Sequence, residues 1–146
     1  MRVLGLRAAA IVAALGLVMT SAAVRGQVPD DQSPAIPQGA SKLEGLPAVR
    51  LDATKDDAKR RPLNRAEATK EKLTISIVNG QYYWTSRENR PLTLRSSGEF
   101  TYLSSADPGL YVRFRKVNDR IAYVEHVDSA LGSVTYWGEL RIVLGR

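Results

Sequence analysis

The strongest constraint on the fold is an apolar–polar alternation with a period of two residues, which begins at Leu73 and recurs to the end of the chain. Such alternation is typical of half-buried β-strands rather than helices. Asn79-Gly80 interrupts it, and this dipeptide favours a two-residue hairpin because both positions accept a positive φ. The expected hairpin pairs Val78 with Gln81, Ile77 with Tyr82 and Ile75 with Trp84, and it leaves Tyr83 on the opposite face.

A second hairpin is expected around Ser96-Ser97-Gly98. A three-residue loop with Gly98 in the left-handed region pairs Leu94 with Phe100 and Leu92 with Tyr102. A two-residue loop pairs Leu94 with Thr101 instead. Because a slip of one residue moves every side chain to the other face, the apolar match favours the longer loop.

The hairpin at Asn118-Asp119 has two possible registers. A two-residue loop pairs Phe114 with Tyr123 and Val112 with Glu125, so that Glu125 faces the apolar side. A shift of one residue pairs Arg113 with Glu125 and turns His126 inward. The first register gives the better aromatic pairing. A buried Glu125 without a partner would have a raised pKa and would be a candidate site residue.

Counting these hairpins and the long last segment, residues 73–146 contain about seven antiparallel strands joined mostly by tight turns. Consecutive strands tend to pair, so the expected topology is a meander. Gly138 lies within the last strand and indicates a bulge or a bend, as a closing strand requires. We therefore expect an all-β fold, a small closed or partly closed β-barrel, with a β-sandwich as the alternative.

Residues 1–26 have the three parts of a secretory signal peptide. Arg2 and Arg7 precede the apolar run from Ala8 to Met19, and small residues follow. Cleavage after Ala23 and cleavage after Gly26 both fit, and the second is preferred. An uncleaved anchor is the alternative, but the uncharged stretch is short for a membrane span. We expect an exported bacterial protein, periplasmic or secreted, with no membrane span after cleavage.

The segment that follows the signal has no aromatic residues and holds most of the prolines. A segment that cannot bury large apolar side chains does not offset its ordering entropy. Residues 27–61 are therefore predicted to be a disordered, Pro-rich linker. Residues 62–72 are predicted to be either a short charged helix, with Asn64 and Glu67 forming a capping box, or more linker.

Composition excludes several function classes. The chain has no cysteine, so thiolate zinc sites and Cys nucleophiles are excluded. Loss of three arginines with the signal lowers the formal net charge from +6 to +3, and the remaining charges are mixed in sign. A basic stripe typical of nucleic-acid binding is missing. No nucleophile elbow or phosphate-binding glycine motif occurs, and we expect no cofactor and no metal.

The sequence therefore predicts an exported, non-catalytic binding or interaction module of the cell envelope, whose partner is an unknown protein, peptide or envelope component. Two alternatives stay open: a small secreted enzyme using Glu125, His126 and Asp128, and a structural or stress-related envelope protein without a discrete ligand. Besides Glu125 and His126, the candidate binding residues are three aromatic residues that fall outside the core alternation, Tyr83, Tyr111 and Trp137.

Overall fold

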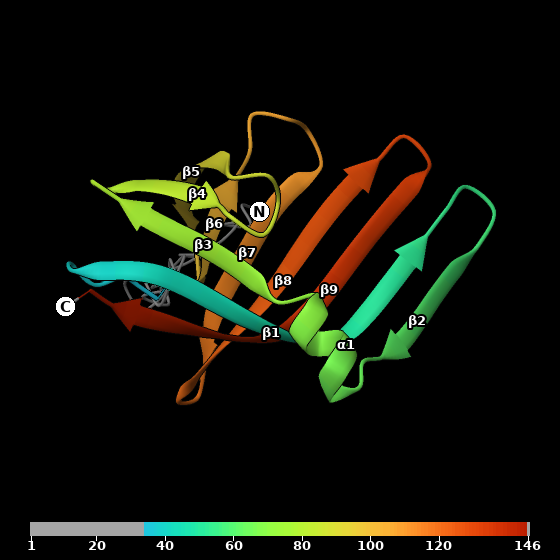
Figure 1. Cartoon of the computed structure of the whole chain (residues 1–146), viewed down its shortest axis with the longest axis horizontal. Helices are drawn as coiled ribbons and strands as arrows, with labels where there is room; N and C mark the ends of the chain where they lie inside the picture. The colour runs from blue at the N-terminus through green and yellow to red at the C-terminus, as the bar shows by residue number, and fades with distance from the viewer. Residues whose placement is uncertain (1–33, 146) are drawn as a thin grey trace, which may run out of the picture.

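The protein forms a closed antiparallel β-barrel of eight strands with one additional strand at its side (Figure 1). The computed structural model describes residues 34–145, so the predicted signal peptide, residues 1–26, lies outside the described residues. Consecutive strands pair from β3 to β9, and β1 pairs with both β3 and β9 to close the barrel. The elements are β1 Ala40–Ala53, β2 Ala58–Pro62, α1 Arg65–Lys70, β3 Leu73–Val78, β4 Gln81–Trp84, β5 Arg90–Ser97, β6 Phe100–Ser104, β7 Leu110–Val117, β8 Arg120–Ser129 and β9 Gly132–Leu144.

The predicted meander is confirmed, and its seven strands are β3 to β9. The Asn79-Gly80 hairpin has the expected register, since Ile75 is opposite Trp84 and Ile77 is opposite Tyr82. At Asn118-Asp119 the first of the two registers is present: Phe114 pairs with Tyr123 and Val112 with Glu125. Local turn chemistry therefore determined both hairpins.

The prediction that residues 27–61 form a linker is wrong for most of its length. β1 and β2 lie within this range, and β1 is the strand that closes the barrel. Leu43 of β1 is fully buried in the core. A Cβ atom added at Gly45 would lie 2.7 Å from the ring of Tyr123. The missing side chain at Gly45 is therefore a packing requirement, because the ring of Tyr123 occupies that space.

The second hairpin has a different register from the one predicted. Its loop is Gly98-Glu99, and Ser97 pairs with Phe100 while Leu94 pairs with Leu103. Gly98 does adopt the expected positive φ, of 58°. The apolar match failed because Phe100 faces outward and packs on arginines: the guanidinium carbons of Arg113 and Arg115 lie 5.3 and 5.4 Å from its ring centroid.

Of the two alternatives for residues 62–72, the helix is present as α1, capped as expected. The Asn64 side chain accepts from the Glu67 amide at 2.9 Å, and the Glu67 carboxylate accepts from the Asn64 amide at 2.9 Å. Within residues 34–145, no helix has the length and apolar character to cross a membrane.

Gly138, predicted to mark a bulge, lies opposite one. The register of β1 against β9 shifts between Pro47 and Val49, and Pro47 pairs with Gly138. A Cβ atom at Gly138 would lie 2.1 Å from the carbonyl oxygen of Leu46. The bulge is thus in the partner strand, and the missing side chain of Gly138 admits it.

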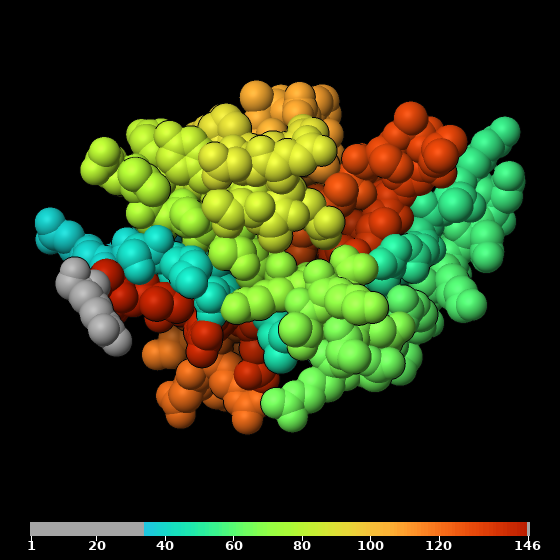
Figure 2. All heavy atoms as spheres, in the orientation of Figure 1, coloured from blue at the N-terminus to red at the C-terminus, as the bar shows by residue number. Residues whose placement is uncertain are grey.

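Apolar side chains fill the barrel interior from all sides. The long strands β8, β9 and β1 continue past the barrel wall, and with β2 they form a sheet that extends to one side (Figure 1). The atoms of this extension lie at the right of the molecule in Figure 2. The buried core cluster consists of Leu43, Leu73, Ile75, Trp84, Leu92, Leu103, Val112, Phe114, Tyr123 and Leu140.

Candidate functional site

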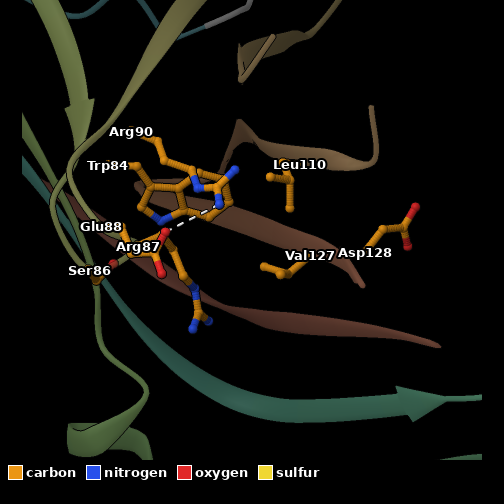
Figure 3. A pocket seen from close by; sticks show the side chains of 8 residues that line it. All are labelled: Trp84, Ser86, Arg87, Glu88, Arg90, Leu110, Val127 and Asp128. Atoms are coloured by element: carbon orange, nitrogen blue, oxygen red, sulfur yellow. Dashed lines mark hydrogen bonds and ion pairs between the residues drawn. The ribbon is translucent and has the colours of Figure 1, made fainter. Parts of the chain in front are cut away.

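The two ends of the barrel differ. At one end the segment before β1 lies against the core: Ile36 packs on it, and the Thr101 hydroxyl donates to the carbonyl oxygen of Pro34 at 3.3 Å. At the other end a pocket of about 320 Å³ opens between the β4–β5 loop and the adjoining ends of β7 and β8. Its lining residues are Trp84, Ser86, Arg87, Glu88, Arg90, Leu110, Val127 and Asp128 (Figure 3). We call this hollow the mouth pocket.

The mouth pocket has apolar walls and a charged rim. Trp84 and Arg90 lie on one side in Figure 3, and Leu110, Val127 and Asp128 face them from the other. An eight-stranded barrel has an interior that side chains fill or that holds one small ligand. Here the side chains fill the middle of the barrel, and a space for a ligand lies at this end.

The β4–β5 loop is held firmly where it contributes to the pocket. The Ser86 hydroxyl accepts from the Thr74 amide at 3.0 Å, and the Thr85 hydroxyl donates to the Thr74 carbonyl oxygen at 2.9 Å. Glu88 and Asn89 both have a φ of 57°, in the left-handed region that few non-glycine residues occupy. Backbone strain of this kind is found preferentially at functional sites.

Beneath the pocket, Arg87 turns into the barrel and binds Glu125. Its Nε and Nη2 atoms each lie 3.0 Å from Oε1 of Glu125, whose side chain is 1 % exposed. In Figure 3 the guanidinium of Arg87 points away from that of Arg90, toward the strands below. A loop residue therefore supplies the charge that a buried carboxylate on β8 requires.

The pair is part of a larger polar network around Tyr136 of β9. The Tyr136 hydroxyl donates to Oε2 of Glu71 at 2.8 Å, and Arg50 Nη1 lies 3.0 Å from Oε1 of the same carboxylate. The guanidiniums of Arg50 and Arg87 both lie over the Tyr136 ring, at 5.5 and 5.7 Å from its centroid. Asp52 holds Arg50 in turn, with a contact of 2.6 Å. The network joins the barrel interior to the face of the extension formed by β1 and β9.

Burial dominates the acid–base behaviour of Glu125. It raises the pKa of this carboxyl to about 7, against the opposing effect of Arg87. Burial likewise raises the pKa of Tyr123, which precedes Glu125 by two positions on the same face of β8. Oε2 of Glu125, the Tyr123 hydroxyl and Nε1 of Trp84 are buried and have no hydrogen-bond partner among the described residues. Buried polar atoms of this kind call for a water molecule or a ligand group.

His126 lies on the opposite face of β8 from Glu125. Its ring stacks on Tyr111, with centroids 5.1 Å apart, and Nδ1 lies 2.8 Å from the Thr135 hydroxyl. Nε2 lies 3.0 Å from Oδ1 of Asp128, so these two side chains lie on the same side of the strand. Residues 34–145 contain no cluster of three or more side chains suited to hold a metal ion.

The three outward aromatic residues do not form one patch. Tyr111 is on β7 and Trp137 on β9, with β8 between them. Tyr83 is on β4, where it pairs with Ser76 and Pro91.

The sequence identified Glu125 as a candidate residue. It did not indicate the residues that surround it, which are Trp84, Arg87, Arg50, Glu71 and Tyr136. A buried carboxylate needs a cationic side chain as its partner, and this requirement could be predicted from the sequence. The sequence does not indicate which of the many arginines is that partner.

Comparison with known proteins gives no match among family models, curated proteins or solved structures.

Proposed function

We propose that the protein is an exported, non-catalytic binding module that takes a small ligand in the mouth pocket. The observation that carries this proposal is the pocket itself: a space of about 320 Å³ in which the apolar side chains of Trp84, Leu110 and Val127 lie among polar and charged ones. Apolar concave sites with a few convergent polar groups are the usual form of small-ligand sites. The unpartnered buried atoms at the same end of the barrel, those of Trp84 and Glu125, support it.

The enzyme alternative has weaker support. Its three residues do not face a common space, because Glu125 is inside the barrel while His126 packs on Tyr111 outside it. A general base and a carboxylate on opposite faces of a strand cannot act on one substrate atom. A partner protein, peptide or envelope component remains compatible with the proposal where it presents a small group to the pocket.

Blocking the pocket tests the proposal. Val127 lines it, whereas Val124 lies on the same strand, between the buried Tyr123 and Glu125, and faces outward. Ligand-observed NMR would compare a panel of small soluble amines, alcohols, carboxylates and sugars against the wild-type protein, Val127→Trp and Val124→Trp. We expect the wild type and Val124→Trp to bind members of the panel and Val127→Trp to lose them. A panel in which no compound distinguishes Val127→Trp from the wild type would refute the proposal.

A further inference from the structure

We infer that the outer wall of the barrel carries a second binding site, which takes a small organic anion, a carboxylate with a short apolar body. The site is a hollow of about 380 Å³, which we call the side pocket, and it is lined by Glu44, Gly45, Leu46, Thr69, Lys72 and Arg141. It shares no lining residue with the mouth pocket, so the inference does not depend on the proposed function. Two features support it: an excess of cations around one carboxylate, and an exposed apolar side chain beside them.

Strand β1 forms the floor of the side pocket. Leu43 points into the core, so Glu44 at the next position faces outward, and Leu46 does the same. Glu44 lies between β3 and β9, where Arg141 of β9 is opposite it. The helix α1 lies beside β1 (Figure 1), and the short link from α1 to β3 supplies Lys72. Residues from several elements therefore converge on one outward-facing carboxylate.

Three cations surround the carboxylate of Glu44, which is 7 % exposed. Its Oε1 atom lies 3.0 Å from Nζ of Lys42 and 2.9 Å from Nζ of Lys72. Nε of Arg141 donates to Oε2 at 2.8 Å, and Nη2 of the same arginine contacts this oxygen as well. These bonds, that of Lys72 most of all, lower the pKa of the Glu44 carboxyl to about 2, so it is ionised at neutral pH. Three positive charges therefore face one negative charge.

The excess of cations is particular to this site. The other ion pairs within residues 34–145 join one arginine, or His126, to one or two carboxylates. A further carboxylate, Glu139 of β9, is opposite Leu46, but Arg120 binds it at 2.6 Å. The positive charge of the side pocket is therefore not cancelled locally, and its field favours an anion.

The cations that line the side pocket keep donors that Glu44 does not use. An ammonium group has three N–H donors and a guanidinium group has five. Lys72 makes one contact with the carboxylate, and Arg141 uses Nε and Nη2, which leaves Nη1. A ligand carboxylate can accept hydrogen bonds from both side chains, whereas an amine would meet like charge. Glu44 thus holds the cations in position without cancelling their charge.

The side pocket also presents apolar surface next to these charges. Leu46 is 51 % exposed and lines the hollow. The methylene stems of Lys72 and Arg141 add further carbon surface. The Thr69 hydroxyl donates to the carbonyl oxygen of Arg65 at 2.8 Å, so its donor is already used within α1. A hydrocarbon group attached to the anion therefore has surface to contact, which inorganic phosphate would leave unused.

Four probes separate charge from apolar contact: 3-phenylpropanoate, 3-phenylpropanol, 3-phenylpropylamine and inorganic phosphate. Their dissociation constants would be measured by ligand-observed NMR with the full-length mature protein at low salt, where exposed charges are least screened. Because a probe can also enter the mouth pocket, the wild type is compared with Val127→Trp, which blocks that pocket. In Val127→Trp we expect the carboxylate to bind about tenfold more tightly than the alcohol, since hydrogen bonds between charged groups gain about that factor. Phosphate and the amine should bind more weakly than the carboxylate.

Substitutions in the side pocket locate the binding. Lys72→Gln and Arg141→Gln should each weaken the carboxylate about tenfold, toward the affinity of the alcohol. The matched control, Lys55→Gln, removes the same charge from the turn between β1 and β2 and should change the affinity by less than about twofold. Leu46→Asn, at an exposed position that folding tolerates, should weaken the carboxylate and leave phosphate unchanged. Thermal unfolding of each variant checks that the barrel is intact.

The outcomes distinguish this inference from the proposed function. Equal binding of carboxylate and alcohol by Val127→Trp would overturn the inference, and so would a carboxylate affinity that survives both Lys72→Gln and Arg141→Gln. Phosphate binding as tight as that of the carboxylate would show that the apolar surface contributes nothing and that the ligand class is wrong. If Val127→Trp abolishes carboxylate binding, the probe occupies the mouth pocket, which supports the proposed function and refutes the side pocket. If no probe binds, the inference is wrong, while the wider panel still decides the proposed function.

Discussion

The buried carboxyl of Glu125 gives the sharpest quantitative test of the structure. Burial raises its pKa to about 7, whereas the ordinary value in an unfolded chain is 4.5. Between these values the unfolded chain has lost a proton that the folded protein keeps, so the free energy of unfolding falls as the pH rises. At about 1.4 kcal/mol per pH unit, the whole interval amounts to a loss of about 3 kcal/mol, after which the dependence on this group levels off above pH 7.

Glu125→Gln should remove this dependence, since the amide keeps the shape of the neutral acid and does not titrate. Chemical denaturation of both proteins at constant ionic strength, from pH 4 to 8.5, measures it. The variant should gain about 3 kcal/mol over the wild type between the two ends of this range. Titrating groups that are remote from Glu125 are common to both proteins and cancel in the difference.

The control is Glu99→Gln, which removes an exposed carboxylate that pairs with Arg115 on the outer surface. Its profile should run parallel to that of the wild type, since exposed ion pairs contribute little. Parallel profiles for the wild type and Glu125→Gln would show that Glu125 is ionised throughout this range in the folded state. The argument that burial outweighs the Arg87 contact would then be refuted.

Three further substitutions test the packing. Leu43→Ala should lower the free energy of unfolding by about 2–5 kcal/mol in denaturant unfolding, because Leu43 is fully buried. Leu46→Ala, at a side chain 51 % exposed on the same strand, should change it by no more than about 0.5 kcal/mol. Equal effects would argue against β1 as a barrel strand. Gly138→Ala should destabilise by more than about 2 kcal/mol, because its Cβ would collide with the backbone of Leu46; a neutral result in thermal unfolding would contradict the close approach of β1 and β9. Asn64→Ala should cost about 1 kcal/mol through loss of the capping box, and an unchanged melting temperature would show that α1 contributes nothing to stability.

The sequence was sufficient where structure depends on neighbours in the chain. The Asn79-Gly80 and Asn118-Asp119 turns determine the register of their hairpins, and the second of these registers placed Glu125 inside. The capping box of Asn64 and Glu67 is equally local. In each case the residues that decide the conformation lie within a few positions of one another.

It was insufficient where the deciding partner is remote. β1 resembles a linker because its small residues are explained only by what packs against them, such as the ring of Tyr123 beside Gly45. Arg87 lies in a loop without periodicity, and its importance follows from Glu125, 38 positions further along. The outward position of Phe100 depends on arginines from β7. Periodicity reports which residues share a face, but it does not report which partner that face will meet.

Closure of the barrel by β1 also constrains how the chain acquires its structure. Leu43 pairs with Ile142, 99 positions later, so the last pairing requires nearly the whole described chain. Contacts of such high sequence separation are made late and slow the folding of a domain. During synthesis the barrel would stay unclosed until the final strand has been released from the ribosome.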